Sequence, residues 1–272
     1  MAFRGSTSPR DDWKHFHFST NDDGIASIVL SRPEKLNALT FEIYADLRDL
    51  LVEIPQREEV RVLTITGEGR GFCSGGDVRE IIGALQEMSS KDLLEFTRMT
   101  GAVVQRMREL PIPIVAGVNG VAAGAGAVIA LAADLRLLAH EASFHFLFTR
   151  VGLAGADMGA AYLLPRVVGL GRATELLLLG ERVEAQEAER IGLGRLTDDL
   201  PAELETVSRA LSTGPGWALG ATKSLLTREL DMSLAGAIEL EAWTQALLMK
   251  SDDHREFYRA FVEKQDPAWR GK

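Results

Sequence analysis

Short apolar stretches that suit strands alternate with longer stretches of helical period along the first two thirds of the chain. Strands are predicted at 15–19, 25–30, 60–67, 114–118, 135–139 and 142–146, the first two joined as a hairpin by Asp22-Asp23-Gly24. Helices are predicted at 40–52, where Thr40 is placed to cap the N-terminus, and at 89–110. The interleaving of the two periods predicts an α/β protein.

A strand, a glycine-rich turn and a helix follow one another twice, around residues 60–85 and 114–133. In the second copy Gly124 and Gly126 stand where the chain enters an apolar, alanine-rich helix. Free N–H groups at such a helix start favour an anion or a developing negative charge. Two such turns brought together could each offer one backbone N–H to a single carbonyl oxygen.

From Arg172 onward the pattern is helical, with segments predicted at 172–179, 185–191, 201–212, 217–228, 233–250 and 253–264. We therefore expect a disordered tail over residues 1–12, a sheet-containing core over 13–200 and a C-terminal helical region over 201–272.

Composition narrows the classes of function. The net charge of −9, without a Lys/Arg block, argues against a nucleic-acid partner. The longest apolar run, 121–133, is too short to cross a membrane, and residues 1–12 lack the apolar segment of a secretory signal. A single cysteine, Cys73, excludes an intrachain disulfide and fits a reducing, cytoplasmic compartment.

Four segments, in this order, resemble the crotonase (enoyl-CoA hydratase/isomerase) superfamily over residues 14–271. They are Arg-Pro-Glu-Lys-Leu-Asn-Ala-Leu at 32–39, Gly-Phe-Cys-Ser-Gly-Gly-Asp at 71–77, Val-Asn-Gly-Val-Ala-Ala-Gly-Ala-Gly at 118–126 and Phe-Val-Glu-Lys at 261–264. The Ala-Gly-Ala-Gly at 123–126, Asp157-x-Gly and Leu-Leu-Pro-Arg-Val at 163–167 are most similar to isomerases of ring-derived acyl-CoA esters.

The resemblance implies a spiral of repeated ββα units, followed by a C-terminal helical trimerisation region. It implies a homotrimer or a dimer of trimers, and an acyl-CoA thioester as substrate. Coenzyme A would enter only as part of that substrate, and neither another cofactor nor a metal is implied.

Carried over by position, the resemblance assigns the oxyanion hole to the N–H groups of Gly76 and Ala125. Residues near coenzyme A would be Arg32, Lys35, Leu36, Ser74, Asp77 and Val78, with Phe261 and Lys264 contributed by a neighbouring subunit. Lys35 and Lys264 could equally be plain solvated lysines. From its own place before a helix, Asp77 is also expected to brace its turn by accepting backbone hydrogen bonds.

The resemblance also bears on the reaction. The two glutamates that hydratases of the superfamily use to activate water correspond here to Val128 and Phe148, which with Met158 would line the acyl pocket. Asp157 stands where several isomerases of the superfamily keep a catalytic carboxylate. A helix N-cap is the alternative interpretation of Asp157, and the sequence leaves open whether a helix start or burial dominates its pKa.

Three functions follow. We favour an acyl-CoA isomerase in which Asp157 moves a proton while the oxyanion hole holds the enolate. A hydratase or thioester hydrolase would use Asp157 to activate water. A protein that binds acyl-CoA or a partner enzyme without catalysis would explain the missing glutamates, although the retained Asp157 and both glycine turns speak against it.

Overall fold

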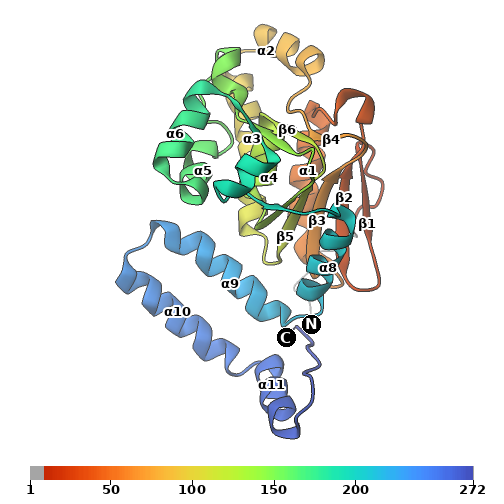
Figure 1. The fold of residues 1–272 in the computed structure, drawn as a ribbon, viewed down its shortest axis with the longest axis vertical. Coiled ribbons are helices and arrows are strands. Elements are labelled where there is room, and N and C mark those ends of the chain that lie inside the picture. The colour runs from red at the N-terminus through yellow and green to blue at the C-terminus, as the bar shows by residue number, and fades with distance from the viewer. Residues whose placement is uncertain (1–8, 272) are drawn as a thin grey trace.

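Two sheets form the framework of the computed structural model, which describes residues 9–271 (Figure 1). Residues 1–8 of the expected tail lie outside the described part. The larger sheet has the order β1-β2-β3-β5-β7-β10, and the smaller one has the order β4-β6-β8-β9. Their bounds are β1 Phe16–Thr20, β2 Ile25–Leu30, β3 Val62–Gly67, β4 Gly71–Cys73, β5 Ile114–Val118, β6 Val121–Ala123, β7 Leu135–Leu138, β8 Ser143–His145, β9 Arg182–Glu184 and β10 Arg195–Leu196.

The strands follow a repeated path. In β3-β4, β5-β6 and β7-β8 the first strand joins the larger sheet and the second joins the smaller one, before helices follow. The paired strands of successive units run parallel. In contrast, β1 pairs antiparallel with β2, and β9 pairs antiparallel with β8. The predicted hairpin and the expected spiral of ββα units are therefore confirmed.

The helices begin and end close to the predicted residues. Thr40 accepts a hydrogen bond from the Ile43 N–H at the start of α1, as predicted, and Ser89 caps α3 in the same way. The helix bounds are α1 Phe41–Glu53, α2 Gly83–Glu87, α3 Ser90–Glu109, α4 Ala125–Ala132, α5 Ala160–Val168, α6 Leu170–Leu179, α7 Ala185–Arg190, α8 Leu200–Ser212, α9 Gly216–Arg228, α10 Leu234–Leu248 and α11 Asp252–Glu263. Shorter turns are η1 Pro33–Lys35, η2 Ile54–Gln56, η3 Val78–Ile82, η4 Leu147–Val151 and η5 Glu229–Asp231.

Two clusters of apolar residues pack on the larger sheet. The main apolar cluster includes every residue of α4 except its glycine, together with the buried faces of α1 and α3. A second cluster joins Val62, Val115 and Leu137 of the sheet to Leu200 of α8. Helix α8 therefore packs on the sheet, although the sequence predicts that the sheet-containing core ends at residue 200.

Helix α9 is tied to the core through buried polar groups. The Lys223 ammonium, which is almost fully buried, donates to the Ile112 carbonyl at 2.9 Å and pairs with Asp134 at 2.8 Å. Helices α10 and α11 extend away from the two sheets (Figure 1). They expose large apolar side chains, namely Leu234, Ile238, Trp243, Leu247, Phe257, Tyr258, Phe261 and Val262. No helix between residues 9 and 271 has the length and apolar character needed to cross a membrane.

Candidate functional site

The first glycine turn is held from one side by Leu39. The Leu39 N–H donates to the Gly75 carbonyl at 2.8 Å, and the Asp77 N–H donates to the Leu39 carbonyl at 2.8 Å. In such a parallel bridge the N–H of the middle residue, Gly76, points away from the strand that makes these bonds. It has no acceptor among residues 9–271.

The second turn leads from β6 into α4 through Gly124, whose φ of 50° lies in the region that favours glycine. The Gly124 N–H donates to the His145 carbonyl at 2.8 Å. Ala125 is the first residue of α4, so no preceding helical carbonyl accepts from its N–H. In the described chain this N–H, like that of Gly76, is without a partner.

The two turns approach each other as closely as glycine permits. A Cβ on Gly126 would lie 2.1 Å from the Cys73 carbonyl oxygen. A Cβ on Gly75 would lie 2.9 Å from the Ala123 carbonyl oxygen and 3.6 Å from the Ala125 nitrogen. The absence of side chains at these positions therefore lets the Gly76 and Ala125 segments come together, which is the condition that the sequence left open. Burial raises the pKa of the intervening Cys73 thiol to about 12, which leaves it a neutral packing group.

Asp77 is the centre of a charge cluster beside the first turn. One oxygen accepts from the N–H groups of Arg79 and Glu80, at 3.0 and 3.2 Å, which confirms the predicted bracing of the turn. The other contacts Arg32 at 3.1 Å and Lys35 at 2.9 Å, and both cations also reach Glu80. The hydrogen bond from Lys35 and those from the backbone lower the pKa of Asp77 to about 2, against the opposing effect of burial.

The other residues expected near coenzyme A fall into two groups. Leu36 packs on Gly71, the Ser74 hydroxyl donates to the Lys35 carbonyl at 3.1 Å, and Val78 is largely exposed. They adjoin the Asp77 cluster. Phe261 is exposed near the end of α11 and Lys264 directly follows that helix, at the opposite end of the molecule from α2 (Figure 1).

Asp157 is not a helix N-cap, so that interpretation is wrong. Helix α5 begins after Gly159, because Met158 and Gly159 adopt left-handed φ values of 49° and 88° and reverse the chain first. The half-buried Asp157 carboxylate turns back to accept from the Met158 N–H at 2.9 Å. Burial raises its pKa above the ordinary value of 3.8, and this hydrogen bond opposes the shift only in part.

Tyr44 is a residue that sequence reasoning missed. It lies on the buried face of α1, where helical period alone makes it a core residue. Its hydroxyl lies 3.8 Å from where a Cβ of Gly76 would be, and the Asp157 charge acts on it. A hydroxyl-bearing aromatic among the aliphatic residues of α1 was the available signal.

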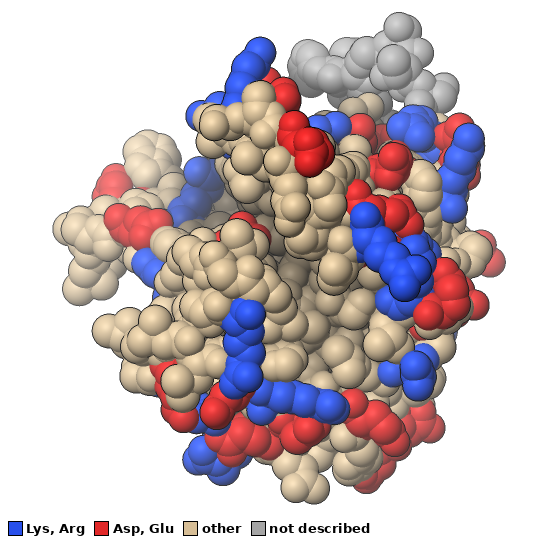
Figure 2. Space-filling view, turned by 90° about the horizontal axis from the view of Figure 1, so that it is seen from above, with Lys and Arg blue, Asp and Glu red and all other residues tan. Residues whose placement is uncertain are grey.

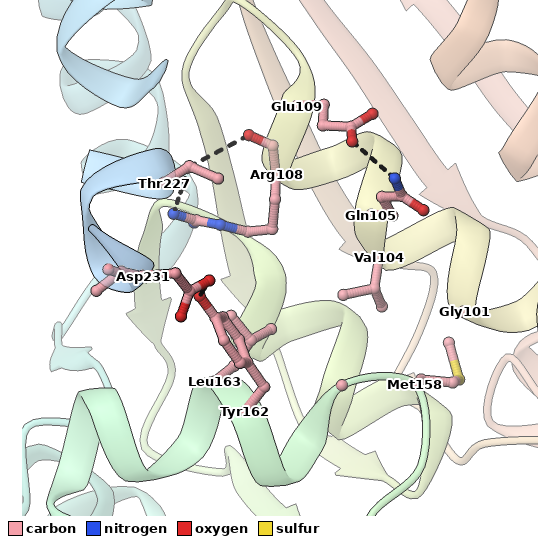
Figure 3. A pocket seen from close by; sticks show the side chains of 12 residues that line it. Gly101, Val104, Gln105, Arg108, Glu109, Met158, Tyr162, Leu163, Thr227 and Asp231 are labelled. Atoms are coloured by element: carbon pink, nitrogen blue, oxygen red, sulfur yellow. Dashed lines mark hydrogen bonds between the residues drawn. The ribbon is translucent and has the colours of Figure 1, made fainter. Parts of the chain in front are cut away.

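A cavity of about 460 Å³ opens between α3, α5 and η5 (Figure 3). Met158, Val104 and Leu163 supply apolar lining, and Arg108 and Asp231 supply charge at the side of the helical region. Of the three residues expected in an acyl pocket, Met158 lines this cavity, whereas Val128 and Phe148 are buried in the core cluster and do not. On the end of the molecule that carries α2, charged side chains surround a hollow of mainly uncharged residues (Figure 2).

Comparison with known proteins agrees with this arrangement. The family model described as enoyl-CoA hydratase/isomerase matches residues 20–272. The chain belongs to the enoyl-CoA hydratase/isomerase family. It is an enzyme family whose members act on acyl-CoA thioesters.

Relatives of both reaction types are similar over almost the whole chain. The 1,2-epoxyphenylacetyl-CoA isomerase of Escherichia coli K12 is 35% identical over 264 residues, 94% of this chain and 99% of that protein. A "probable enoyl-CoA hydratase" of Rhodobacter capsulatus is 38% identical over 253 residues, 92% and 96% of the two chains. The crystal structure of a candidate enoyl-CoA hydratase from Streptomyces coelicolor A3(2) is 58% identical, with a TM-score of 0.97 and full coverage of both chains.

The Asp77 cluster predicts a specific acid sensitivity of the fold. Because the pKa of Asp77 is lower in the folded chain than the ordinary 3.8, its contribution to the free energy of unfolding is complete above pH 4 and is lost as the pH falls toward 2. Asp77→Asn should therefore lower the free energy of unfolding at neutral pH by no more than about 2 kcal/mol. In the variant, the fall of this free energy between pH 4 and pH 2 should also be smaller than in the unmodified protein. Urea unfolding at several pH values measures both effects. Asp198→Asn, at a fully exposed carboxylate, is the control; equal curves for the Asp77 variant and the unmodified protein would contradict the prediction.

Proposed function

We propose that this protein is an acyl-CoA isomerase in which Asp157 is the single base. The Asp157 carboxylate takes a proton from the acyl carbon next to the thioester carbonyl, which breaks that C–H bond. The electron pair moves to the thioester oxygen as an enolate, and the carboxylic acid returns the proton at another carbon of the same conjugated system. No atom is added, so the product is an isomer of the substrate.

The two unpartnered N–H groups support the oxyanion part of the proposal. Gly76 and Ala125 offer donors on segments that meet at glycine contacts, and no side chain there competes for them. Rigid donors aimed at a developing oxyanion each contribute about 3 kcal/mol to the barrier reduction in comparable sites. The thioester carbonyl would bind between these groups, with the acyl part toward Asp157 and Met158.

The observation that carries the choice of isomerase is the isolation of Asp157. Burial raises the pKa of Asp157, which suits a carboxylate that must both take and return a proton. Val128 and Phe148, at the positions where the resemblance places the two water-activating glutamates, are apolar and buried. A single desolvated carboxylate, without either glutamate, supports proton transfer between carbons better than the orientation of a water molecule.

Hydration is the second candidate, favoured by the names of two of the relatives described above. In that reaction Asp157 would take a proton from water, whose oxygen would add to the acyl group. The substrate class and the oxyanion hole would be the same, so only the fate of solvent oxygen separates the two reactions.

We also propose that coenzyme A binds beside the Asp77 cluster and that neighbouring subunits complete the site. Arg32 and Lys35 contact Asp77, the Ser74 hydroxyl binds the Lys35 carbonyl, and Leu36 and Val78 directly follow Lys35 and Asp77 in the sequence. The cations are already paired with carboxylates, so phosphate binding requires Lys35 to leave Glu80 in part. The apolar side chains exposed on α10 and α11 support a homotrimer or a dimer of trimers, which would bring Phe261 and Lys264 from one subunit to the next.

Replacing Asp157 by Asn tests the assigned base. Asn keeps the size of the side chain but cannot take a proton, so kcat should fall about 10²- to 10⁴-fold while the Kd of a saturated acyl-CoA stays within a few-fold. The activity of the unmodified enzyme should fall as the pH is lowered, with a pKa above 3.8, because Asp157 becomes protonated. This fall should be absent in the variant. Turnover of 3-enoyl-CoA against pH measures both; unchanged turnover would contradict the assignment.

Isotope uptake separates the two candidate reactions. Straight-chain 2- and 3-enoyl-CoA and aromatic acyl-CoA esters are incubated with enzyme in deuterated water enriched in heavy oxygen. Isomerisation should exchange deuterium into carbon without adding solvent oxygen, as mass spectrometry of the product detects. Solvent oxygen in the product would favour hydration or hydrolysis instead.

Gly75→Ala tests the contact between the two turns. The new Cβ would meet the Ala123 carbonyl, at a backbone φ of 94°, and would push the turns apart. We expect kcat to fall about 100-fold, the scale of one lost oxyanion donor, in protein that still folds. Gly83→Ala is the matched control, since its Cβ meets no atom within 4 Å in α2. Circular dichroism checks folding; full activity of folded Gly75→Ala would contradict the oxyanion hole.

A further inference from the structure

The cavity between α3, α5 and η5 is apolar at one side and polar at the other. Met158 and Gly159 belong to the apolar side, and Val104 lies on that side too (Figure 3). Both directly follow Asp157 in the chain, so the Cα atom of Met158 is about 3.8 Å from that of the assigned base. The opposite side, toward η5 and the end of α9, carries polar side chains, namely Arg108, Tyr162, Thr227 and Asp231. An acyl group that extends from Asp157 into this cavity would meet hydrocarbon first and polar groups at its far end.

The Arg108 guanidinium on the polar side has a donor that the protein leaves unused. Its Nη1 contacts Asp134 at 3.1 Å, and its Nη2 donates to the Thr227 hydroxyl at 3.0 Å. The Nε group is shielded from solvent and has no hydrogen-bond partner among residues 9–271. In arginine, Nε and Nη2 form one edge of a planar fork, which matches the two oxygens of a carboxylate. A neutral hydroxyl from Thr227 fills only half of that edge.

Positive charge exceeds negative charge in the ion pairs that Arg108 joins. Arg108 and Lys223 share the single carboxylate of Asp134, which lies 2.8 Å from the Lys223 ammonium. The nearby Arg136 donates to three backbone carbonyls, and the described chain offers it no carboxylate. Burial lowers the pKa of Arg136 to about 10, and the Arg108 charge adds to this effect. A further anion at Arg108 would therefore be matched by cations that share too few carboxylates.

The two carboxylates in the cavity wall already have cations of their own. Asp231 pairs with Arg166 at 3.3 Å and accepts from the Tyr162 hydroxyl at 2.7 Å. Glu109 pairs with Arg106 at 3.1 Å. Because these charges are compensated locally, the wall has one cation, Arg108, whose charge is incompletely matched.

We propose that Arg108 is a specificity-determining residue that binds a carboxylate at the far end of the acyl chain. The substrate class is then the mono-CoA ester of a dicarboxylic acid. The carboxylate would take the edge formed by Nε and Nη2 and replace the Thr227 hydroxyl, which also lines the cavity. This inference rests on the proposed acyl-CoA function. It adds a choice among acyl groups that Asp157 and the oxyanion donors cannot make, because they act beside the thioester.

Calorimetric binding of saturated, unreactive esters tests the proposal. Hexanedioyl-, octanedioyl- and decanedioyl-CoA are each compared with the alkanoyl-CoA of the same carbon number. For at least one chain length the dicarboxylic ester should bind about tenfold more tightly, the scale of a hydrogen bond between charged groups. A cavity without a cation for the far carboxylate would give the opposite order, because burial of an unpaired charge is unfavourable.

Three variants assign the preference to Arg108. Arg108→Gln should reverse it, while the Kd of the alkanoyl ester stays within a few-fold. Arg106→Gln is the matched control, because it makes the same change of charge on α3 at a half-exposed residue that does not line the cavity. Asp231→Asn leaves Arg108 in place and removes a negative charge from the wall, so the preference should grow about two- to fivefold. Asp231→Asn keeps the test decisive if circular dichroism shows that Arg108→Gln does not fold.

The outcomes separate this inference from the function on which it rests. Equal binding of the two esters, or tighter binding of the alkanoyl ester, at every chain length would overturn the role of Arg108 while acyl-CoA binding stands. A folded Arg108→Gln that keeps the preference, or an Asp231→Asn that weakens it, would overturn that role too. If no ester binds, the acyl-CoA function itself fails. The binding ratio does not depend on turnover, so a failure of Asp157 as the base leaves this test intact.

Discussion

The close approach of backbone to backbone between the two glycine turns is the constraint on which the candidate site depends. The carbonyl of Cys73 occupies the place of a Cβ on Gly126, and Gly75 lies against Ala123, although less tightly. Because β4 and β6 pair in the smaller sheet, this contact fixes the positions of the Gly76 and Ala125 N–H groups relative to each other. Donors set by covalent backbone and sheet pairing need no reorganisation when charge develops between them.

Two aspartates on either side of these turns have opposite electrostatic surroundings. Asp77 accepts two backbone N–H groups and contacts two cations, so its pKa is lowered to about 2 and it stays ionised. Asp157 accepts one N–H and is desolvated, so its pKa is raised. The same side chain thus serves as a fixed structural charge in one place and is suited to proton exchange in the other.

What the sequence predicted well was local. Thr40 caps α1 because the capping bond lies within three residues, and Asp77 braces its turn for the same reason. The strands β4 and β6 were not predicted, since a strand of three residues carries little period and its pairing comes from distant segments. The position of Asp157 before α5 depends on two left-handed residues, Met158 and Gly159, and the first of these is not a residue that favours such a turn. The nearness of the Tyr44 hydroxyl to Gly76 was not predictable either, because the two residues lie on different segments.

The attachment of α9 links the helical region to the same strand that leads to the oxyanion donors. A Cβ on Gly220 would lie 2.2 Å from the Pro111 carbonyl oxygen, and Lys223 binds the next carbonyl, that of Ile112. Figure 3 shows Arg108, at the end of α3, bonded to Thr227 near the end of α9. These contacts hold the segment that enters β5, and the chain leaving β5 passes through β6 to Ala125. These contacts therefore join α9 to the entry of β5, a strand whose residues are all buried and packed on both faces.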